Sequence, residues 1–549
     1  MQVEEFDPGT IEDETVRHVV ISLINLVETL SAQLQAKDAI IQQLRDELNR
    51  LKGEQGKPKI RGNTKASDLS SEHERRESKP RSQQGKRDRI KIDREEVVSV
   101  DRSQLPEDAV FKGYQDVVMQ DLIVCTDHVL FHKEKYYAKS TGHTYVAALP
   151  AGYRGQFGPH VRALVLALYY ESGMSEPKIR DFLLTMGLSI SAGELSNLLI
   201  KDQDLFHAES AEVVKAGLSS SPWQHLDSTG TRVNGQNQHC HVLCNPLYSF
   251  YYTTPAKDRR SYLRVLFGGA DLIFRYTAEA IVLLSQLRVS AKWVDQLSAL
   301  LPMQVDFTEE QITAILDASL PRMGPEVRKN VLDALAIAAY HSQTSYPIVD
   351  LLICDDAPQF NWLTAWIALC WIHEFRHYKK LIPRFEQHRQ ALEKWNKAFW
   401  EFYRKLAAYR AEPDPVQAPA LQAEFDELFT KKSDYDQLDE CKARTLKKRD
   451  QLLMVLSHPE ILLHNNPAEL GARSRVRKRD VSLQARTSDG IAAWDTFQTL
   501  VATAKKLGVN IFHYFQDRIL QAHTLPSFAS LISERAPSMA LGTSWEQGP

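Results

Sequence analysis

The sequence predicts an α/β protein of several domains, in which one mixed sheet is interrupted by all-helical segments. Apolar runs with strand-like alternation predict the sheet, and Asn234-Gly235 is a strong hairpin turn signal between the first two runs. Strands followed by a helix, and then by further strands with helices, give an α/β order. A length of 549 residues favours several domains rather than one. The predicted strands cover 223–233, 238–244, 247–254, 348–354 and 366–371.

The composition is that of an ordinary globular protein. Hydrophobic residues make up 43% of the chain, enough to build a core, and the formal net charge is only -3. Six cysteines are spread over the whole length, which is too few for a disulfide framework and fits a reducing compartment. No N-terminal segment resembles a signal peptide, and the apolar runs at 161–170 and 362–372 are too short to cross a bilayer. We therefore expect a cytoplasmic protein without membrane contact.

A heptad repeat runs through residues 20–51. Its apolar positions alternate spacings of three and four, which places one seam along a long helix. Lys37 is the one polar member of the seam, and a polar residue there often sets the register of a coiled coil. The pattern predicts a leucine zipper that joins two copies of the chain; the alternative is a helix packed on its own globular body. The seam consists of Val20, Leu23, Val27, Leu30, Leu34, Lys37, Ile41, Leu44, Leu48 and Leu51.

Two less regular regions follow the heptad. Residues 53–94 are polar, and between 57 and 91 the 12 Lys and Arg residues exceed the 5 Asp and Glu residues. This predicts a flexible basic linker, which is either a phosphate contact or simply a solvated connection. Residues 95–150 contain segments that alternate like strands and predict a small β-rich module.

Residues 151–220 are predicted to be helical. One short helix is expected at about 177–186, Gly187 breaks it, and a capping box from Ser191 to Glu194 starts the next. Helix, short turn, helix is the pattern of a DNA-binding helix-turn-helix. Two helices that merely pack in a helical domain explain the same spacing.

Two further helical stretches are predicted to interrupt the sheet. Apolar residues at helical spacing fill 276–344, and two long helical segments span 375–457 around a Pro- and Ala-rich break at 412–419. More helices are expected around Glu469 and at 489–507. The tail after about Pro526 has no clear pattern.

Three acids stand in settings that point to chemistry. Asp227 and Asp355 each end an apolar strand-like run, and Glu469 lies on a later helix just ahead of a basic run. Carboxylate oxygens suit Mg²⁺ and Mn²⁺, and two such ions roughly 3.5–4 Å apart stabilise the attacking and leaving oxygens of a phosphoryl transfer. Asp356 competes with Asp355 for one position, and Glu374 competes with Glu469 for the other. Acids on a solvated surface are the alternative for all of them.

The basic run after Glu469 is a candidate phosphate contact. Binding through it is expected to weaken with salt. The alternative is a solvated helix face. The run contains Arg473, Arg475, Arg477, Lys478 and Arg479.

Other chemistries find less support. Cys370 and His373 have the spacing of half a zinc site, but no second pair has fitting spacing. We therefore expect Cys370 in the core and His373 near the active site. The sequence contains no Gly-x-Ser-x-Gly elbow and no phosphate-binding Gly-rich loop, so neither a serine hydrolase nor ATP use is implied.

With these motifs, the chain resembles the DDE transposases of the insertion sequence 66 family over nearly its whole length. In related transposases a Cys-x-x-His motif and an all-helical insertion precede the catalytic glutamate, which favours Glu469 over Glu374. The family's second aspartate directly follows its strand, which favours Asp355 over Asp356. The most specific matches are Asp227-Ser-Thr followed by Arg232-Val, Cys370-Trp-x-His373, and Asn465-Asn-x-x-Glu469 with Arg473 behind it.

The chain departs from the family at several points and is a divergent member by resemblance. It has Ser228 where the family usually has glutamate, and His464 where the family usually has aspartate. The module at 95–150 has only Cys125, so its zinc site is lost. The helical stretch at 276–344 is an additional insertion.

The resemblance implies an RNase H-like core in which Asp227, Asp355 and Glu469 are catalytic and bind two Mg²⁺ or Mn²⁺ ions. His373, Asn465 and Asn466 would lie near this site. The implied enzyme binds the terminal inverted repeats of its element, cuts the DNA and joins the ends to target DNA. It would work as a homodimer or larger oligomer near the bacterial nucleoid, with or without accessory proteins of the same element. A transposase-derived regulator without catalysis and an RNase H-like nuclease are the alternatives.

The predicted domains follow from these boundaries. They are a zipper at 1–52, a linker at 53–94, a β-rich module at 95–150, a helical DNA-binding domain at 151–220, core segments at 221–275, 345–374 and 461–526, helical insertions at 276–344 and 375–460, and a tail at 527–549.

Overall fold

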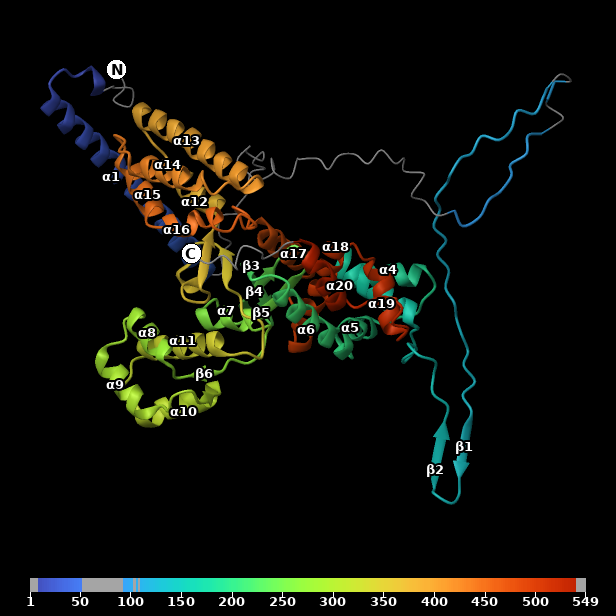
Figure 1. The fold of residues 1–549 in the computed structure, drawn as a ribbon. Helices are drawn as coiled ribbons and strands as arrows, with labels where there is room; N and C mark the ends of the chain where they lie inside the picture. Colours follow the sequence, from blue (N-terminus) through green and yellow to red (C-terminus); the bar gives the residue numbers. More distant parts are fainter. Residues whose placement is uncertain (1–7, 52–91, 102–104, 107–108, 540–549) are drawn as a thin grey trace.

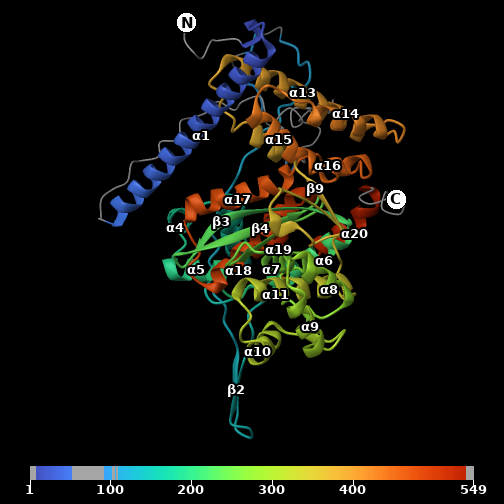
Figure 2. The same ribbon diagram turned by 90° about the vertical axis from the view of Figure 1, so that its left-hand side faces the viewer.

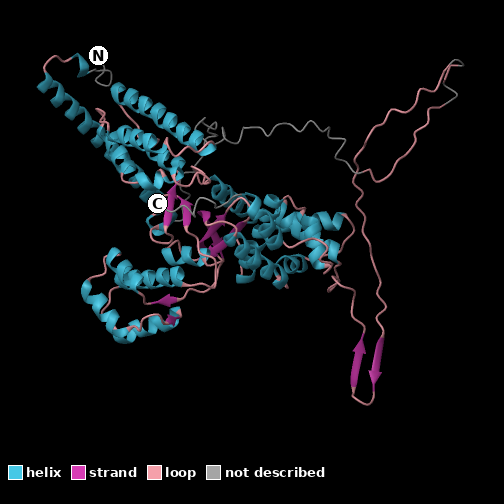
Figure 3. Ribbon diagram, viewed as in Figure 1, coloured by secondary structure: helices cyan, strands magenta, loops and turns pink. Residues whose placement is uncertain are grey.

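A central mixed sheet of five strands organises the protein (Figure 1). The structure is a computed structural model, and it describes residues 8–51, 92–101, 105–106 and 109–539. Helices surround the sheet, so this part of the chain is a mixed α/β protein, as the sequence predicts (Figure 3). In their order across the sheet, the strands are β5 (Ser249–Thr254), β4 (Gln236–Cys244), β3 (Trp223–Val233), β8 (Leu351–Cys354) and β9 (Trp366–Leu369).

The first three strands form an antiparallel meander, and the last two run parallel to β3. Val233 pairs with Gln236, so Asn234 and Gly235 alone make the turn between β3 and β4. Both turn residues have positive φ, 46° and 77°, as a type I′ turn requires. The hairpin predicted from the Asn-Gly pair is therefore confirmed.

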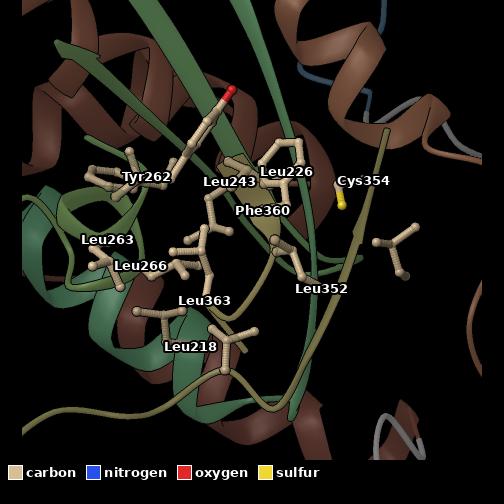
Figure 4. Close-up of a cluster of buried hydrophobic side chains, with 14 of the residues drawn as sticks. Leu218, Leu226, Leu243, Tyr262, Leu263, Leu266, Leu352, Cys354, Phe360 and Leu363 are labelled. Carbon is tan, nitrogen blue, oxygen red and sulfur yellow. The ribbon is translucent and has the colours of Figure 1, made fainter. Parts of the chain in front are cut away.

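A buried apolar cluster fixes the central strands. Figure 4 shows its side chains, which come from α6 (Asp204–Ser219), α7 (Arg259–Leu266), the central strands and the loop after β8. Full burial of a leucine contributes roughly 1.5–3 kcal/mol, so this cluster holds β3 and β8 firmly together. Leu226 and Cys354 belong to it, and each immediately precedes one of the candidate catalytic aspartates.

The first helical insertion lies between β5 and β8, below the sheet in Figures 1 and 2. Its longest helix is buried without a break from Val331 to Tyr340, which makes it the core of this lobe. A small sheet of β6 (Phe274–Arg275) and β7 (Asp306–Phe307) also belongs to it, and the helical periodicity does not predict these short strands. The helices are α8 (Ala278–Gln286), α9 (Ala291–Leu300), α10 (Glu309–Ser319) and α11 (Pro325–Ser342).

The second helical insertion follows β9 and packs around aromatic side chains. Trp371 lies at its base, with its ring against those of Phe399 and Phe425. The predicted break falls between α13 and α14, as the Pro- and Ala-rich stretch indicates. The helices are α12 (Trp371–Tyr378), α13 (Glu386–Ala411), α14 (Ala418–Thr430), α15 (Asp436–Leu446) and α16 (Arg449–Leu452).

One long helix, α1 (Glu14–Leu51), packs against this second insertion (Figures 1 and 2). Ile24, Asn25 and Glu28 are buried in the contact. A carboxylate oxygen of Glu28 accepts a hydrogen bond from the backbone N–H of Arg384 at 2.7 Å. By length and composition α1 is also long and apolar enough to cross a membrane. This is not expected from the sequence, and one such helix near the N-terminus is weak evidence for a membrane protein.

The two short helices predicted in this region are present as α4 (Glu176–Thr185) and α5 (Ala192–Ile200). Gly187, with φ of 87°, follows α4, and the capping box between Ser191 and Glu194 starts α5. Around them pack α3 (Pro159–Leu166), the π-helix η5 (Ala167–Glu171), α6, and the C-terminal helices α17 (Asn466–Ser482), α18 (Ser488–Leu507), α19 (Ile511–Ile519) and α20 (Phe528–Arg535).

Of the tail predicted at 527–549, the described residues up to 539 are more ordered than the sequence indicates. Phe528 and Ile532 of α20 are buried, and the Phe528 ring stacks on Tyr514 with centroids 3.8 Å apart. A helix of this length carries too few periodic positions to be recognised from sequence, so tertiary packing defines it.

Residues 92–101 and 109–150 extend away from the rest of the protein (Figure 1). Of the β-rich module predicted at 95–150, the described residues contain one hairpin, β1 (Lys135–Ala138) with β2 (His143–Val146). Strand-like alternation in 121–126 is not matched by a strand, and the side chains there are exposed among the described residues; Ile123 is 82% exposed. Most of the linker at 53–94 lies outside the described residues.

Candidate active site

Asp227 lies in β3, and Asp355 directly follows β8, the parallel strand beside β3. His225 of β3 pairs with Ile353 of β8, and continuing this register by two residues sets Asp227 opposite Asp355. Parallel neighbours are about 4.8 Å apart, so both carboxylates share the place where β8 ends. The apolar run ends at Asp227, but the strand does not. β3 continues to Val233 in the hairpin with β4.

Asp227 sits where its charge is disfavoured. Burial raises its pKa from 3.8 to about 6, and the carboxylates of Glu469 and Asp355 add to the shift. A hydrogen bond of 2.8 Å from the backbone N–H of Ser228 and the charge of Lys257 oppose it only in part. The three acids therefore form one interacting group with too little positive charge around Asp227, and a bound cation relieves such repulsion.

The helix α17 brings Glu469 to the aspartates. Asn465 precedes the helix and is fully buried, and its side-chain N–H₂ donates to the carbonyl of Leu226 at 2.8 Å, one residue before Asp227. Further along, Gly471 allows a close approach to the sheet, since a Cβ there would lie 2.6 Å from Val242 of β4. Glu469 lies in the first turn, where the helix dipole favours an anionic side chain.

Two residues of α12 flank Glu469. His373 Nδ1 lies 3.6 Å from one carboxylate oxygen, and Arg376 Nη2 lies 3.2 Å from the other. Burial, together with the charge of Arg376, lowers the pKa of His373, so its ring is neutral near pH 7. The sequence places His373 near the site. It does not single out Arg376, because no motif distinguishes that arginine from its neighbours.

A second acidic group lies near the end of β8. Asp356 and Glu374 both accept from the Lys448 ammonium, at 2.6 and 2.8 Å. Glu374 is only 3% exposed and also accepts from the Thr445 hydroxyl at 2.6 Å. Burial alone would raise the pKa of Asp356, but the hydrogen bond to Lys448 and its charge lower it below the usual value. The two competing acids are thus neutralised by a lysine from the second insertion.

Two groups of side chains in the described part of the chain have ligand atoms within 4.8 Å of one another. One is Asp356, Glu374 and His377, where Lys448 already supplies the positive charge. The other is Cys370, His373 and Glu469. Burial raises the pKa of Cys370 to about 11, so its sulfur is a thiol, which accepts from the backbone N–H of Asn465 at 3.3 Å. Cys370 therefore belongs to the core, as expected. The hard carboxylate oxygens of Asp227, Asp355 and Glu469 fit Mg²⁺ or Mn²⁺ better than a soft metal.

The basic run on α17 divides into two faces, which corrects the prediction for two of its members. Arg475 is fully buried and pairs with Asp495 of α18. Lys478 is buried as well, and its ammonium donates to the carbonyl of Tyr169 in η5 at 2.9 Å. Neither is available to phosphate, because helical spacing turns both into the core. Arg479 bonds the carbonyl of Gly230, while Arg473 and Arg477 are exposed.

The sequence comparisons bear on this site. A model of the transposase IS66 family matches residues 344–493, from just before β8 into α18. The matched region contains Asp355 and Glu469 but not Asp227. It is an IS66-family transposase domain, so the family resemblance of the sequence is confirmed.

The chain is also similar to a curated protein, the uncharacterized protein y4jO of Sinorhizobium fredii (strain NBRC 101917 / NGR234). The two are 29% identical over 339 residues, which cover 59% of this chain and the whole of that protein. The name of this relative states no activity.

Proposed function

We propose that the chain is a DDE-type DNA transposase whose Asp227, Asp355 and Glu469 hold two Mg²⁺ or Mn²⁺ ions. One observation carries the proposal: Asp227 and Asp355 each lie two residues beyond the last pair in the parallel register of β3 and β8, and the carboxylates of Glu469 and Asp355 both raise the pKa of Asp227. The sheet order, with three antiparallel strands followed by two that run parallel to β3, supports an RNase H-like core. The family match over the second and third acids supports the same chemistry.

Divalent ions held by these carboxylates would stabilise the attacking and leaving oxygens of an in-line phosphoryl transfer. The chain's own part is to hold the carboxylates in place and to offset phosphate charge. Arg376 is 47% exposed and Lys257 is half-buried, so both side chains are placed to face a phosphate that approaches the acids. Cutting at a transposon end and joining to target DNA would use this one site in succession.

DNA would reach the site along α17. Glu469, Arg473 and Arg477 follow each other at intervals of four residues, so they share one face of the helix. The two arginines are exposed and extend the acidic site with positive charge. Double-stranded transposon ends and target DNA are the proposed ligands, with the pair α4 and α5 as a second contact.

We propose that α1 joins two copies of the chain. The docked residues Ile24, Asn25 and Glu28 lie on one side of the helix, and the heptad seam lies on nearly the opposite side, at about 100° per residue. The apolar seam residues from Leu23 to Leu48 are 46% to 62% exposed, which is unusual for a regular apolar stripe without a partner. A second copy of α1 covers such a seam in register.

The mass of the chain in solution tests this pairing. Leu30→Glu with Leu34→Glu places charges in the seam, so the double variant should have half the mass of the wild type. Ala36→Glu is the control, because Ala36 is exposed and lies on another face of α1; it should leave the mass unchanged. A wild-type chain that is already a monomer would contradict the pairing.

The test of the catalytic proposal is a cleavage and strand-transfer assay on DNA that carries the element's own ends. Metal-dependent joined products from the wild type, lost in Asp227→Ala, Asp355→Ala and Glu469→Ala, are expected. Asp356→Asn and Glu374→Gln are the matched controls, since these acids are paired with Lys448. Specific binding of ends without chemistry would favour the regulator, and cutting without joined products would favour a nuclease.

A further inference from the structure

The hydrogen bonds around Asn465 reach the backbone next to every proposed catalytic acid. Its side-chain N–H₂ donates to the carbonyl of Leu226, the residue before Asp227, at 2.8 Å. Its side-chain oxygen lies 3.0 Å from Nδ1 of His225. Since that oxygen only accepts, the imidazole must carry its proton on Nδ1. Asn465 and His225 are both fully buried.

Cys370 extends the same network to the second aspartate. Its backbone N–H donates to the carbonyl of Cys354, the residue before Asp355, at 3.1 Å. Its sulfur accepts the backbone N–H of Asn465 at 3.3 Å. The carbonyl of Asn465 in turn accepts the N–H of Glu469 at 3.1 Å in the first turn of α17.

We propose that His225, Cys370 and Asn465 form a positioning clamp that sets the spacing of the three carboxylates. None of the hydrogen bonds described above involves a carboxylate, so these are positioning residues rather than catalytic ones. The clamp joins β3, the start of α12 and the start of α17, and it reaches the residue before each aspartate and the backbone of Glu469. The inference rests on the proposed function, because it assigns a role to that same site.

The chemistry of the clamp is specific to its side chains. Asparagine offers a donor to Leu226 and an acceptor to His225 at once, which leucine of similar shape does not. Without Asn465 the buried carbonyl of Leu226 loses its partner, and the ties to β3 are cut. Partners of this kind orient metal ligands, and their loss typically weakens metal affinity by about 10- to 100-fold.

A matched control exists elsewhere on the sheet. Asn245 is also fully buried, donates to the carbonyl of Gly217 and the hydroxyl of Ser220, and accepts from the N–H of Leu247. Asn245→Leu therefore removes comparable hydrogen bonds from the core without touching the clamp. It separates a loss of stability from a loss of positioning.

The experiment measures Mn²⁺ binding to the full chain by electron paramagnetic resonance, together with thermal stability. Asn465→Leu is expected to weaken binding by about 10- to 100-fold, while Asn245→Leu lowers stability similarly and keeps wild-type affinity. His225→Asn, which retains a donor at the Nδ1 position, should preserve binding that His225→Leu loses. If Asn465→Leu does not fold, the comparison of His225→Asn with His225→Leu tests the clamp in its place.

The two proposals fail in different ways. Mn²⁺ binding that needs Asp227 but is unchanged in Asn465→Leu and His225→Leu would overturn the clamp alone. A wild-type chain that binds no Mn²⁺ would overturn the proposed function, and the clamp with it.

Discussion

Two acidic groups lie near the end of β8, and they differ in what neutralises them. In one, Lys448 donates to both Asp356 and Glu374, and the charges are balanced within the chain. In the other, burial raises the pKa of Asp227 to about 6, the carboxylates of Glu469 and Asp355 add to the shift, and the charge of Lys257 opposes it only in part. A paired acid holds the fold together, whereas an acid left short of positive charge is available for a cation from outside.

The largest effect should separate two adjacent residues. Asp355→Asn is expected to reduce metal-dependent DNA cleavage by on the order of 10³-fold, since metal ions contribute several kcal/mol to such reactions. Asp356→Asn should retain activity close to wild type, because that carboxylate bonds Lys448 instead. Cleavage rates at matched protein stability test this difference. Equal losses in the two variants would erase the distinction between the two groups.

Removal of the lysine should convert the balanced group into an unbalanced one. Lys448→Met is expected to cost about 2 kcal/mol, less than the 3–5 kcal/mol for breaking a fully buried pair, because Lys448 is partly exposed. Denaturant unfolding measures the loss. Adding Glu374→Gln should recover part of it, since the buried charge is then removed as well. A single variant as stable as the wild type would show that the lysine does not stabilise this group.

The pH dependence should differ between the two groups. A folded pKa of Asp227 raised from 3.8 to about 6 means that the native chain binds more protons than the unfolded chain in that interval. Stability from Asp227 is therefore fully present below 3.8 and is lost as pH rises through 6. Melting temperatures of the metal-free wild type should fall relative to Asp227→Asn across this interval. A constant difference would contradict the unbalanced state of the trio.

The smallest effect concerns the arginine beside Glu469. Arg376 is half exposed, so Arg376→Gln should change stability by no more than about 0.5 kcal/mol. Because a competing cation is removed, Mn²⁺ should bind a few times more tightly, as a calorimetric titration would measure. Weaker binding in this variant would mean that Arg376 orients Glu469 instead of competing for it.

Local patterns predict much of the fold. The Asn234-Gly235 turn, the capping box at Ser191 and the strand before Asp355 all depend on neighbours in sequence, and all appear where expected. The short strands of β6 and β7 and the helix α20 depend on distant partners. Their periodicity is too brief to be seen in the sequence alone.

The candidate site shows the same limit. Asp355 and Asp356 share one sequence setting, and only the family resemblance favours Asp355 there. In the structure Lys448, 92 residues further on, bonds Asp356. The basic run after Glu469 reads as a uniform cationic surface, yet Arg475 and Lys478 turn inwards. Charge alone did not predict this, since the partners that bury them, Asp495 and Tyr169, lie on other elements.

The most direct test of the account is a Mn²⁺ titration of the wild type, Asp355→Asn and Asp356→Asn, followed by electron paramagnetic resonance. We expect the wild type and Asp356→Asn to bind Mn²⁺ alike, and Asp355→Asn to lose this binding. Loss of binding in Asp356→Asn, with Asp355→Asn unaffected, would place the metal in the group that Lys448 occupies and contradict the proposed active site.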